Sequence, residues 1–157
     1  MTVAEKFAGT WTFAESENFD AYLKQIGISQ IFARSILFFR TSNDQLLFFV
    51  GVGLIMRGIA KNLKPTLTFS MNGNKWKIVS ESRFKKHVWE FELGEEFDET
   101  TPDGRQVKSK FFLEGDVLVQ LENAIKASDK STRFERYIDE QGQLVIVSLI
   151  VVIIFCN

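Results

Sequence analysis

The side chains that most often perform catalysis or bind metals are scarce in this chain. Its 157 residues include one histidine, His87, and one cysteine, Cys156. A catalytic triad needs a histidine beside a nucleophile and an acid, and a structural zinc site needs several Cys or His ligands. We therefore expect neither an enzyme nor a bound metal or cofactor, and we expect His87 to be an ordinary strand residue.

Two other patterns imitate functional motifs. Gly51 and Gly53 follow an apolar run, as in a dinucleotide-binding loop, but the third glycine, Gly58, stands too far along the chain. The acidic run at residues 95–99 lacks the alternating oxygen ligands and the downstream glutamate of a calcium loop. We expect this run to be a solvated turn.

Composition and charge narrow the class of protein. Hydrophobic residues make up 45% and charged residues 25%, which is typical of one folded domain. The net charge of −1 shows no excess of basic residues of the kind that binds nucleic acid. The uncharged stretches at residues 45–56 and 141–157 are shorter than the roughly 20 apolar residues of a membrane span. The first sixteen residues contain no apolar signal segment, so we expect a cytoplasmic protein.

The hydrophobic periodicity predicts a mostly β protein with two helices near its N-terminus. Residues 7–15 alternate as a strand, residues 19–26 and 54–61 have helical spacing, and Asn72-Gly73 signals a hairpin turn. Short strands follow at regular spacing, at residues 86–93, 94–101, 106–113, 117–122 and 131–138. Seven or more strands at this spacing indicate a β-barrel or a β-sandwich, and the 16 phenylalanines indicate a dense core or an apolar cavity.

Four segments carry a family resemblance. They resemble the intracellular fatty-acid-binding proteins in order and spacing: GTWTFAESENFDAYLKQI at residues 9–26, KPT at 64–66, ESRFK at 81–85 and FELGEEFDETTPDGRQVKS at 91–109. The resemblance implies an all-β fold, a ten-stranded antiparallel up-and-down barrel of the calycin group, covered by a helix-turn-helix lid. It also implies a non-enzymatic carrier of long-chain fatty acids or similar lipids, without a cofactor and monomeric.

The same resemblance implies which residues meet the ligand. Arg136 best matches the family's carboxylate-binding arginine on the eighth strand, with Arg133 as the competing position. The other positions that the resemblance indicates are the portal residues Phe19, Tyr22, Leu23, Arg57 and Phe84 and the cavity-edge residues Asp103 and Arg105. The expected strand registers add four residues that should point inward: Trp89, Gln120, Glu122 and Ile146. Ordinary lid packing is the alternative for the portal residues, and turn chemistry is the alternative for Asp103 and Arg105. A register slip of one residue would reverse the inward set.

Two segments depart from the family pattern within the single domain at residues 1–157. Residues 28–51 are rich in apolar side chains and resemble an insertion between the lid helices, and residues 149–157 replace the family's last strand and its Arg-x-Tyr pair. We interpret both as retained-intron or mis-spliced sequence. Because residues 144–156 contain no turn residue, we expect an incomplete barrel, an unpaired first strand and self-association.

Three alternatives to a fatty-acid carrier follow from these departures. The first is a carrier of retinoid or another hydrophobic ligand. The second is a form that associates with membranes, since the apolar side chains of residues 28–39 could form one face of an amphipathic helix. The third is a poorly functional splice variant.

Overall fold

The described residues form one long antiparallel sheet with a short helix at one end. A computed structural model describes residues 1–17, 64–83, 86–101, 104–148 and 152–156. The elements are α1 (Val3–Phe7), β1 (Gly9–Glu17), β2 (Thr66–Asn72), β3 (Lys75–Glu81), β4 (Lys86–Glu92), β5 (Glu96–Thr100), β6 (Gln106–Glu114), β7 (Val117–Ala124), β8 (Thr132–Ile138), β9 (Leu144–Ser148) and β10 (Val152–Cys156). The all-β, ten-stranded fold is therefore confirmed, whereas the expected lid helices lie outside the described residues.

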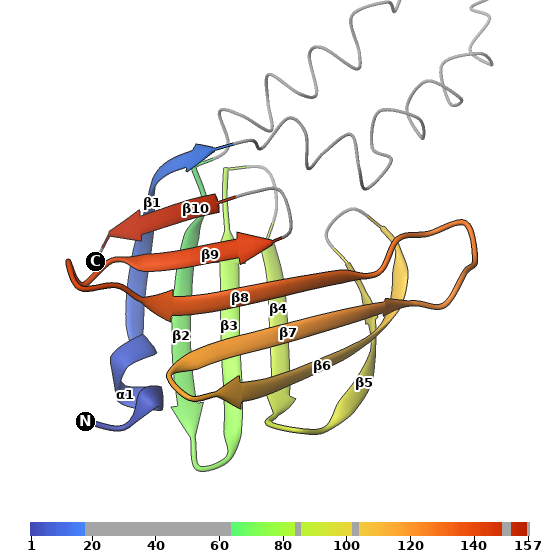
Figure 1. Ribbon diagram of the computed structural model, residues 1–157, viewed down its shortest axis with the longest axis horizontal. Helices are drawn as coiled ribbons and strands as arrows, with labels where there is room; N and C mark the ends of the chain where they lie inside the picture. The colour runs from blue at the N-terminus through green and yellow to red at the C-terminus, as the bar shows by residue number, and fades with distance from the viewer. Residues whose placement is uncertain (18–63, 84–85, 102–103, 149–151, 157) are drawn as a thin grey trace, which may run out of the picture.

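The ten strands follow the order β4-β3-β2-β1-β10-β9-β8-β7-β6-β5. Strands β1 to β4 run steeply in Figure 1, and β6 to β9 cross in front of them, so the curved sheet faces itself. The two ends of this order, β4 and β5, are consecutive in the chain. Within the described residues they share no ladder of backbone hydrogen bonds.

Alternation of apolar and polar residues determines the two faces of the sheet. In β3, Trp76 and Ile78 are buried while Lys75 and Lys77 are exposed, because successive side chains of a strand point to opposite faces. The predicted hairpin between β2 and β3 is present, and Asn72 pairs with Lys75 across it. Gly73 has a φ of 61°, a left-handed conformation that glycine adopts without a steric penalty.

The first strand begins later than the sequence predicts. Phe7 belongs to α1, because Thr2 and Glu5 form a capping box: Glu5 N donates to Thr2 Oγ1 at 3.2 Å and Thr2 N donates to Glu5 Oε2 at 2.6 Å. The expectation of a strand over residues 7–15 is thus wrong at its start. Phe7 is fully buried against Phe69 and Trp76, with ring centroids 5.5 and 6.2 Å away, so α1 contributes to the core.

The expectation of an unpaired first strand is also wrong. Residues 144–156 form two strands, and β10 pairs with β1 on one side and with β9 on the other. Three residues, 149–151, separate the two strands. A connection of that length is sufficient for an antiparallel hairpin, even without glycine, proline or asparagine.

Candidate functional site

Buried polar side chains gather on the inward face of β7 and β8. On β7, Gln120 and Glu122 are 0% and 3% exposed, and on β8 Arg136 is 6% exposed. The register pairs Arg136 with Leu118 on β7 and with Ile146 on β9, both of which belong to the hydrophobic core. These three polar side chains therefore point into the apolar interior.

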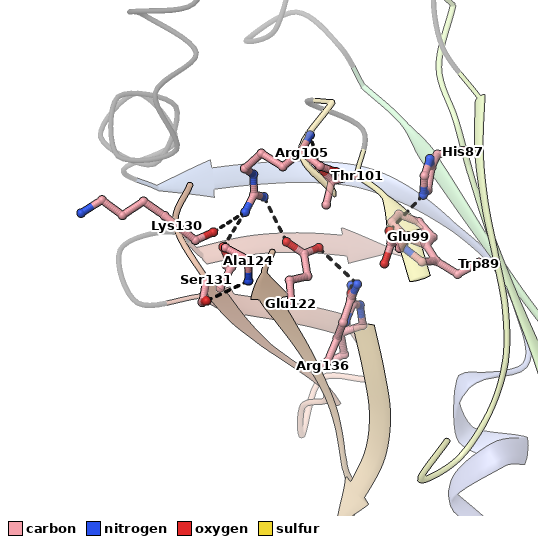
Figure 2. Close-up of polar contacts among 12 residues, drawn as sticks. His87, Trp89, Glu99, Thr101, Arg105, Glu122, Ala124, Lys130, Ser131 and Arg136 are labelled. Atoms are coloured by element: carbon pink, nitrogen blue, oxygen red, sulfur yellow. Dashed lines mark hydrogen bonds and ion pairs between the residues drawn. The ribbon is translucent and has the colours of Figure 1, made fainter. Parts of the chain in front are cut away.

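The first part of this group is a buried ion pair. Arg105 Nη2 lies 3.0 Å from Glu122 Oε2, and both side chains are almost fully enclosed, at 5% and 4% exposed. Arg105 Nη1 also donates to the backbone oxygen of Lys130 at 2.6 Å, a contact drawn in Figure 2. Charges removed from water need close partners of this kind, so Glu122 neutralises Arg105 inside the protein.

Gln120 connects this pair to the second arginine. Its Nε2 donates to Glu122 Oε1 at 3.2 Å, and its Oε1 accepts from Arg136 Nη2 at 2.7 Å. The guanidinium carbon of Arg136 lies 5.7 and 5.6 Å from the ring centroids of Phe111 and Phe134. Arg136 thus combines a neutral acceptor with aromatic surfaces, an arrangement that suits an anionic group attached to a hydrocarbon.

The competing arginine has a different environment. Arg133 is 41% exposed, and it forms ion pairs with Glu114 at 2.7 Å and Glu135 at 2.8 Å. Hydrogen bonds to Glu135 and then to Glu114 raise the pKa of the Arg133 guanidinium. Side chains three positions apart on a strand point to opposite faces. Of the two arginines of β8, Arg136 is therefore on the buried face and Arg133 on the exposed one.

The other residues predicted at the site fall into two sets. Trp89 and Ile146 are buried in the core, on β4 and β9. Phe19, Tyr22, Leu23, Arg57, Phe84 and Asp103 lie outside the described residues, as do residues 28–51. The structure thus brings Arg105, Gln120, Glu122 and Arg136 into one connected group, with Ile146 opposite Arg136.

Sequence reasoning missed one buried acid. Glu95, Glu96 and Asp98 are exposed, as expected for a solvated turn, but Glu99 is only 8% exposed. The expectation is wrong at this residue, because the acidic run continues into β5, where Glu99 shares the inward side with Phe97. The strand period of two in this segment is the signal that would have identified it.

A hollow of about 690 Å³ opens beside β2 to β5, and Trp76, Phe91 and Phe97 are among its lining residues. The Phe91 ring stacks on Phe111 with centroids 3.7 Å apart, and Phe111 is the ring beside Arg136. Apolar aromatic surface therefore continues from the arginine toward the free ends of the sheet.

Within the described ranges, no group of three or more His, Cys, Asp or Glu side chains is placed to hold a metal ion. The described helix is also too short to cross a membrane.

Comparisons with known proteins agree with this architecture. Residues 45–144 match the family described as "Lipocalin / cytosolic fatty-acid binding protein family". "Fatty acid-binding protein homolog 5" of Caenorhabditis elegans is 40% identical over 146 residues, which cover 93% of this chain and 88% of that protein. "Fatty acid-binding protein homolog 6" of the same organism is 37% identical over 137 residues, covering 87% and 84%.

Solved structures are similar over nearly the whole chain. Apo lipid binding protein 8 of Caenorhabditis elegans has a TM-score of 0.75 and 27% identity, covering 98% of this chain and 96% of that one. A Schistosoma mansoni fatty acid binding protein in complex with arachidonic acid has a TM-score of 0.73 and 27% identity, covering 99% and 98%.

Proposed function

The chain belongs to the lipocalin / cytosolic fatty-acid binding protein family, whose members bind lipids and are not enzymes, and we propose that its ligand is a long-chain fatty acid. The ligand lies between the two facing parts of the sheet in this proposal. Arg136 meets its carboxylate, and the aromatic core contacts its hydrocarbon chain.

The observation that carries this proposal is the environment of Arg136. Its guanidinium is buried, donates to the neutral Gln120 at 2.7 Å and lies beside two phenylalanine rings. Arg105 Nη2, in the same connected group, lies 3.0 Å from the carboxylate of Glu122. A fatty-acid carboxylate is a bidentate match for the guanidinium, so Arg136 is the site that favours an acid.

The hydrocarbon chain supplies most of the affinity. Burial gains roughly 0.8 kcal/mol per methylene before ordering costs, and a hydrogen bond to a charged group adds about 1.5–3 kcal/mol. A long chain therefore determines how tightly the ligand binds, and Arg136 determines its orientation and the preference for an acid. The family's Arg-x-Tyr pair has no counterpart in β10, whose sequence is VIIFC.

The cellular setting belongs to the same proposal. We propose a cytoplasmic carrier that exchanges ligand by transient contact with membranes and acts as a monomer. The ladders of β10 with β1 and β9 support the monomer, because they remove the unpaired edge that predicted self-association.

Native mass spectrometry of the purified full chain tests this function. We expect a monomer carrying one long-chain fatty acid, which organic extraction removes and added hexadecanoic acid restores. Retinol binding tighter than hexadecanoic acid would instead support the retinoid alternative. A chain that binds neither ligand would overturn the proposal.

A further inference from the structure

A second polar group lies on the inward face, apart from the arginines. Glu99 Oε1 accepts a hydrogen bond from Trp89 Nε1 at 2.6 Å, and His87 Nε2 lies 3.2 Å from the same oxygen (Figure 2). Trp89 and His87 are on β4 and Glu99 is on β5, so these contacts join the two free ends of the sheet. They occupy only one of the two carboxylate oxygens.

The other oxygen, Glu99 Oε2, is buried, and no hydrogen-bond partner for it exists among the described residues. The same holds for the hydroxyl of Ser109 on β6, a residue that is 0% exposed. Buried polar atoms without partners are rare, because each has lost its hydrogen bonds to water without replacement. Two such atoms on neighbouring strands indicate that a polar group of a bound ligand lies between them.

The register places these two atoms on one face and close together. Ser109 pairs with Phe97 and Val107 pairs with Glu99, so Ser109 and Glu99 are diagonal neighbours across β5 and β6. Such neighbours are separated by about 7–8 Å, a span that one small group between the two side chains can bridge. Ser109 also pairs with Glu122 on β7, which belongs to the arginine group.

We propose that Glu99 and Ser109 form a subsite for a hydroxyl group on the bound acyl chain, so that the ligand class includes hydroxylated fatty acids. This inference rests on the proposed function. The hydroxyl donates to Glu99 Oε2 and accepts from the Ser109 hydroxyl, and a methylene group can do neither. A second carboxylate on the ligand is disfavoured, because it would face the negative charge of Glu99.

The position of the subsite predicts where the hydroxyl stands on the chain. Arg136 is on β8 and Glu99 is on β5, three strand spacings away, or about 14 Å across the strands. The two are also displaced along the strands, because Arg136 pairs with Leu118, Leu118 pairs with Leu113, and the partner of Glu99 is Val107, six residues from Leu113 on β6. A carboxylate at Arg136 therefore leaves the hydroxyl well away from the carboxyl carbon. Mid-chain and terminal hydroxyls fit this placement, and hydroxyls at carbons 2 or 3 do not.

The experiment compares hexadecanoic acid with its derivatives that carry one hydroxyl group, at carbon 2, 3, 12 or 16. Fluorescence displacement gives the ratio of dissociation constants, plain acid over hydroxylated acid, for the natural chain, Ser109→Ala and Glu99→Gln. Ser148→Ala is the matched control, because Ser148 is a buried serine on β9, away from β5 and β6. The indole ¹⁵N resonance of Trp89 reports whether the ligand reaches the Glu99 carboxylate.

We expect the natural chain to prefer the 12- or 16-hydroxy acid by about tenfold and to show no preference for the 2- or 3-hydroxy acid. Ser109→Ala and Glu99→Gln reduce that preference severalfold, whereas Ser148→Ala retains it. The Trp89 resonance shifts more with the preferred hydroxy acid than with the plain acid.

Equal affinity for plain and hydroxylated acids in the natural chain would overturn the proposal, since an ordered water would then satisfy both atoms. A preference that persists in both subsite variants would overturn it as well. Ser109→Ala removes a single oxygen atom, so it keeps the test valid even if Glu99→Gln does not fold. Failure of the plain acid to bind would instead contradict the proposed function itself.

Discussion

The two parts of the sheet that face each other carry different chemistry on their inner surfaces. Strands β1 to β4 contribute the aromatic half, whose buried residues include Trp11, Leu67, Phe69, Trp76 and Ile78. Strands β5 to β8 contribute the polar half, with Glu99, Ser109, Gln120, Glu122 and Arg136 among its buried residues. One surface is suited to hydrocarbon and the other to the groups that orient it.

The two halves also differ in how their residues depend on one another. The aromatic half is stabilised by the hydrophobic effect, whose free energy is roughly proportional to the apolar area buried and does not depend on direction. In the polar half, each side chain contacts the next, from Arg105 to Glu122, Gln120 and Arg136. Loss of one member there leaves the neighbouring polar group unsatisfied, so we expect changes in the polar half to affect both stability and ligand choice.

Removal of β10 is expected to have the largest effect, because this strand joins the two halves through its ladders with β1 and β9. Truncation after residue 151 exposes two strand edges, so we expect loss of cooperative unfolding and self-association. Sedimentation velocity and thermal unfolding monitored by circular dichroism measure both effects. Removal of Asn157 alone is the control, and a truncated chain that stays monomeric and cooperative would contradict this role of β10.

Glu122→Leu breaks the polar half at its buried ion pair. We expect a loss of about 3–5 kcal/mol in the free energy of unfolding, because Arg105 is left buried without its carboxylate partner. Chemical denaturation checks this value. The double variant Arg105→Leu/Glu122→Leu should be more stable than Glu122→Leu, and Glu114→Leu, which alters an exposed pair, should change stability little.

Ile78→Ala creates a cavity in the aromatic half, where Ile78 is 1% exposed. We expect a loss of about 2–5 kcal/mol in the free energy of unfolding, with the preference for an acid over an alcohol retained. Val79→Ala, one position along β3, is the control. If Ile78→Ala lost the preference for an acid, ligand choice would depend on the aromatic half as well as on the polar half, which would contradict the comparison.

The smallest effect is expected on the outer face of the sheet. Glu90 Oε1 lies 2.6 Å from Lys77 Nζ, and this hydrogen bond, with the lysine charge, holds the pKa of Glu90 below its ordinary value of 4.5. A lowered folded-state pKa stabilises the protein above the unfolded-state pKa, and this contribution disappears as the pH falls through the lowered value.

Glu90→Gln should therefore reduce the melting temperature by about 1–2 °C at pH 7 and by less at pH 3. Differential scanning calorimetry at both pH values measures the difference. Glu92→Gln, on the same face of β4, is the control. A reduction that is larger at pH 3 than at pH 7 would contradict the direction of the shift.

Local patterns predicted most of the described fold. The period of two in β3 and the Asn72-Gly73 turn act through neighbouring residues, and the structure confirms both. The family resemblance is likewise confirmed. The C-terminal strands were not predictable from turn residues, because β10 is determined by distant partners, β1 among them.

The site was predictable only in part, for a similar reason. The sequence of β8 left Arg133 and Arg136 as alternatives, because a shift of one residue exchanges the two faces of a strand. Only the pairing of β8 with β7 and β9 shows that Arg136 is the buried one. The partners of Glu99, which are Trp89 and His87 of β4, are likewise contacts between separate strands that the sequence does not reveal.

The central claim is that Arg136, rather than general burial, makes the polar half select an acid. Isothermal titration of hexadecanoic acid and hexadecanol into the natural chain, Arg136→Met and Arg133→Met measures this directly. We expect Arg136→Met to weaken acid binding by about tenfold or more with little change for the alcohol, and Arg133→Met to leave both affinities nearly unchanged. Equal weakening of acid and alcohol in Arg136→Met, or the same acid-specific loss in Arg133→Met, would contradict the claim.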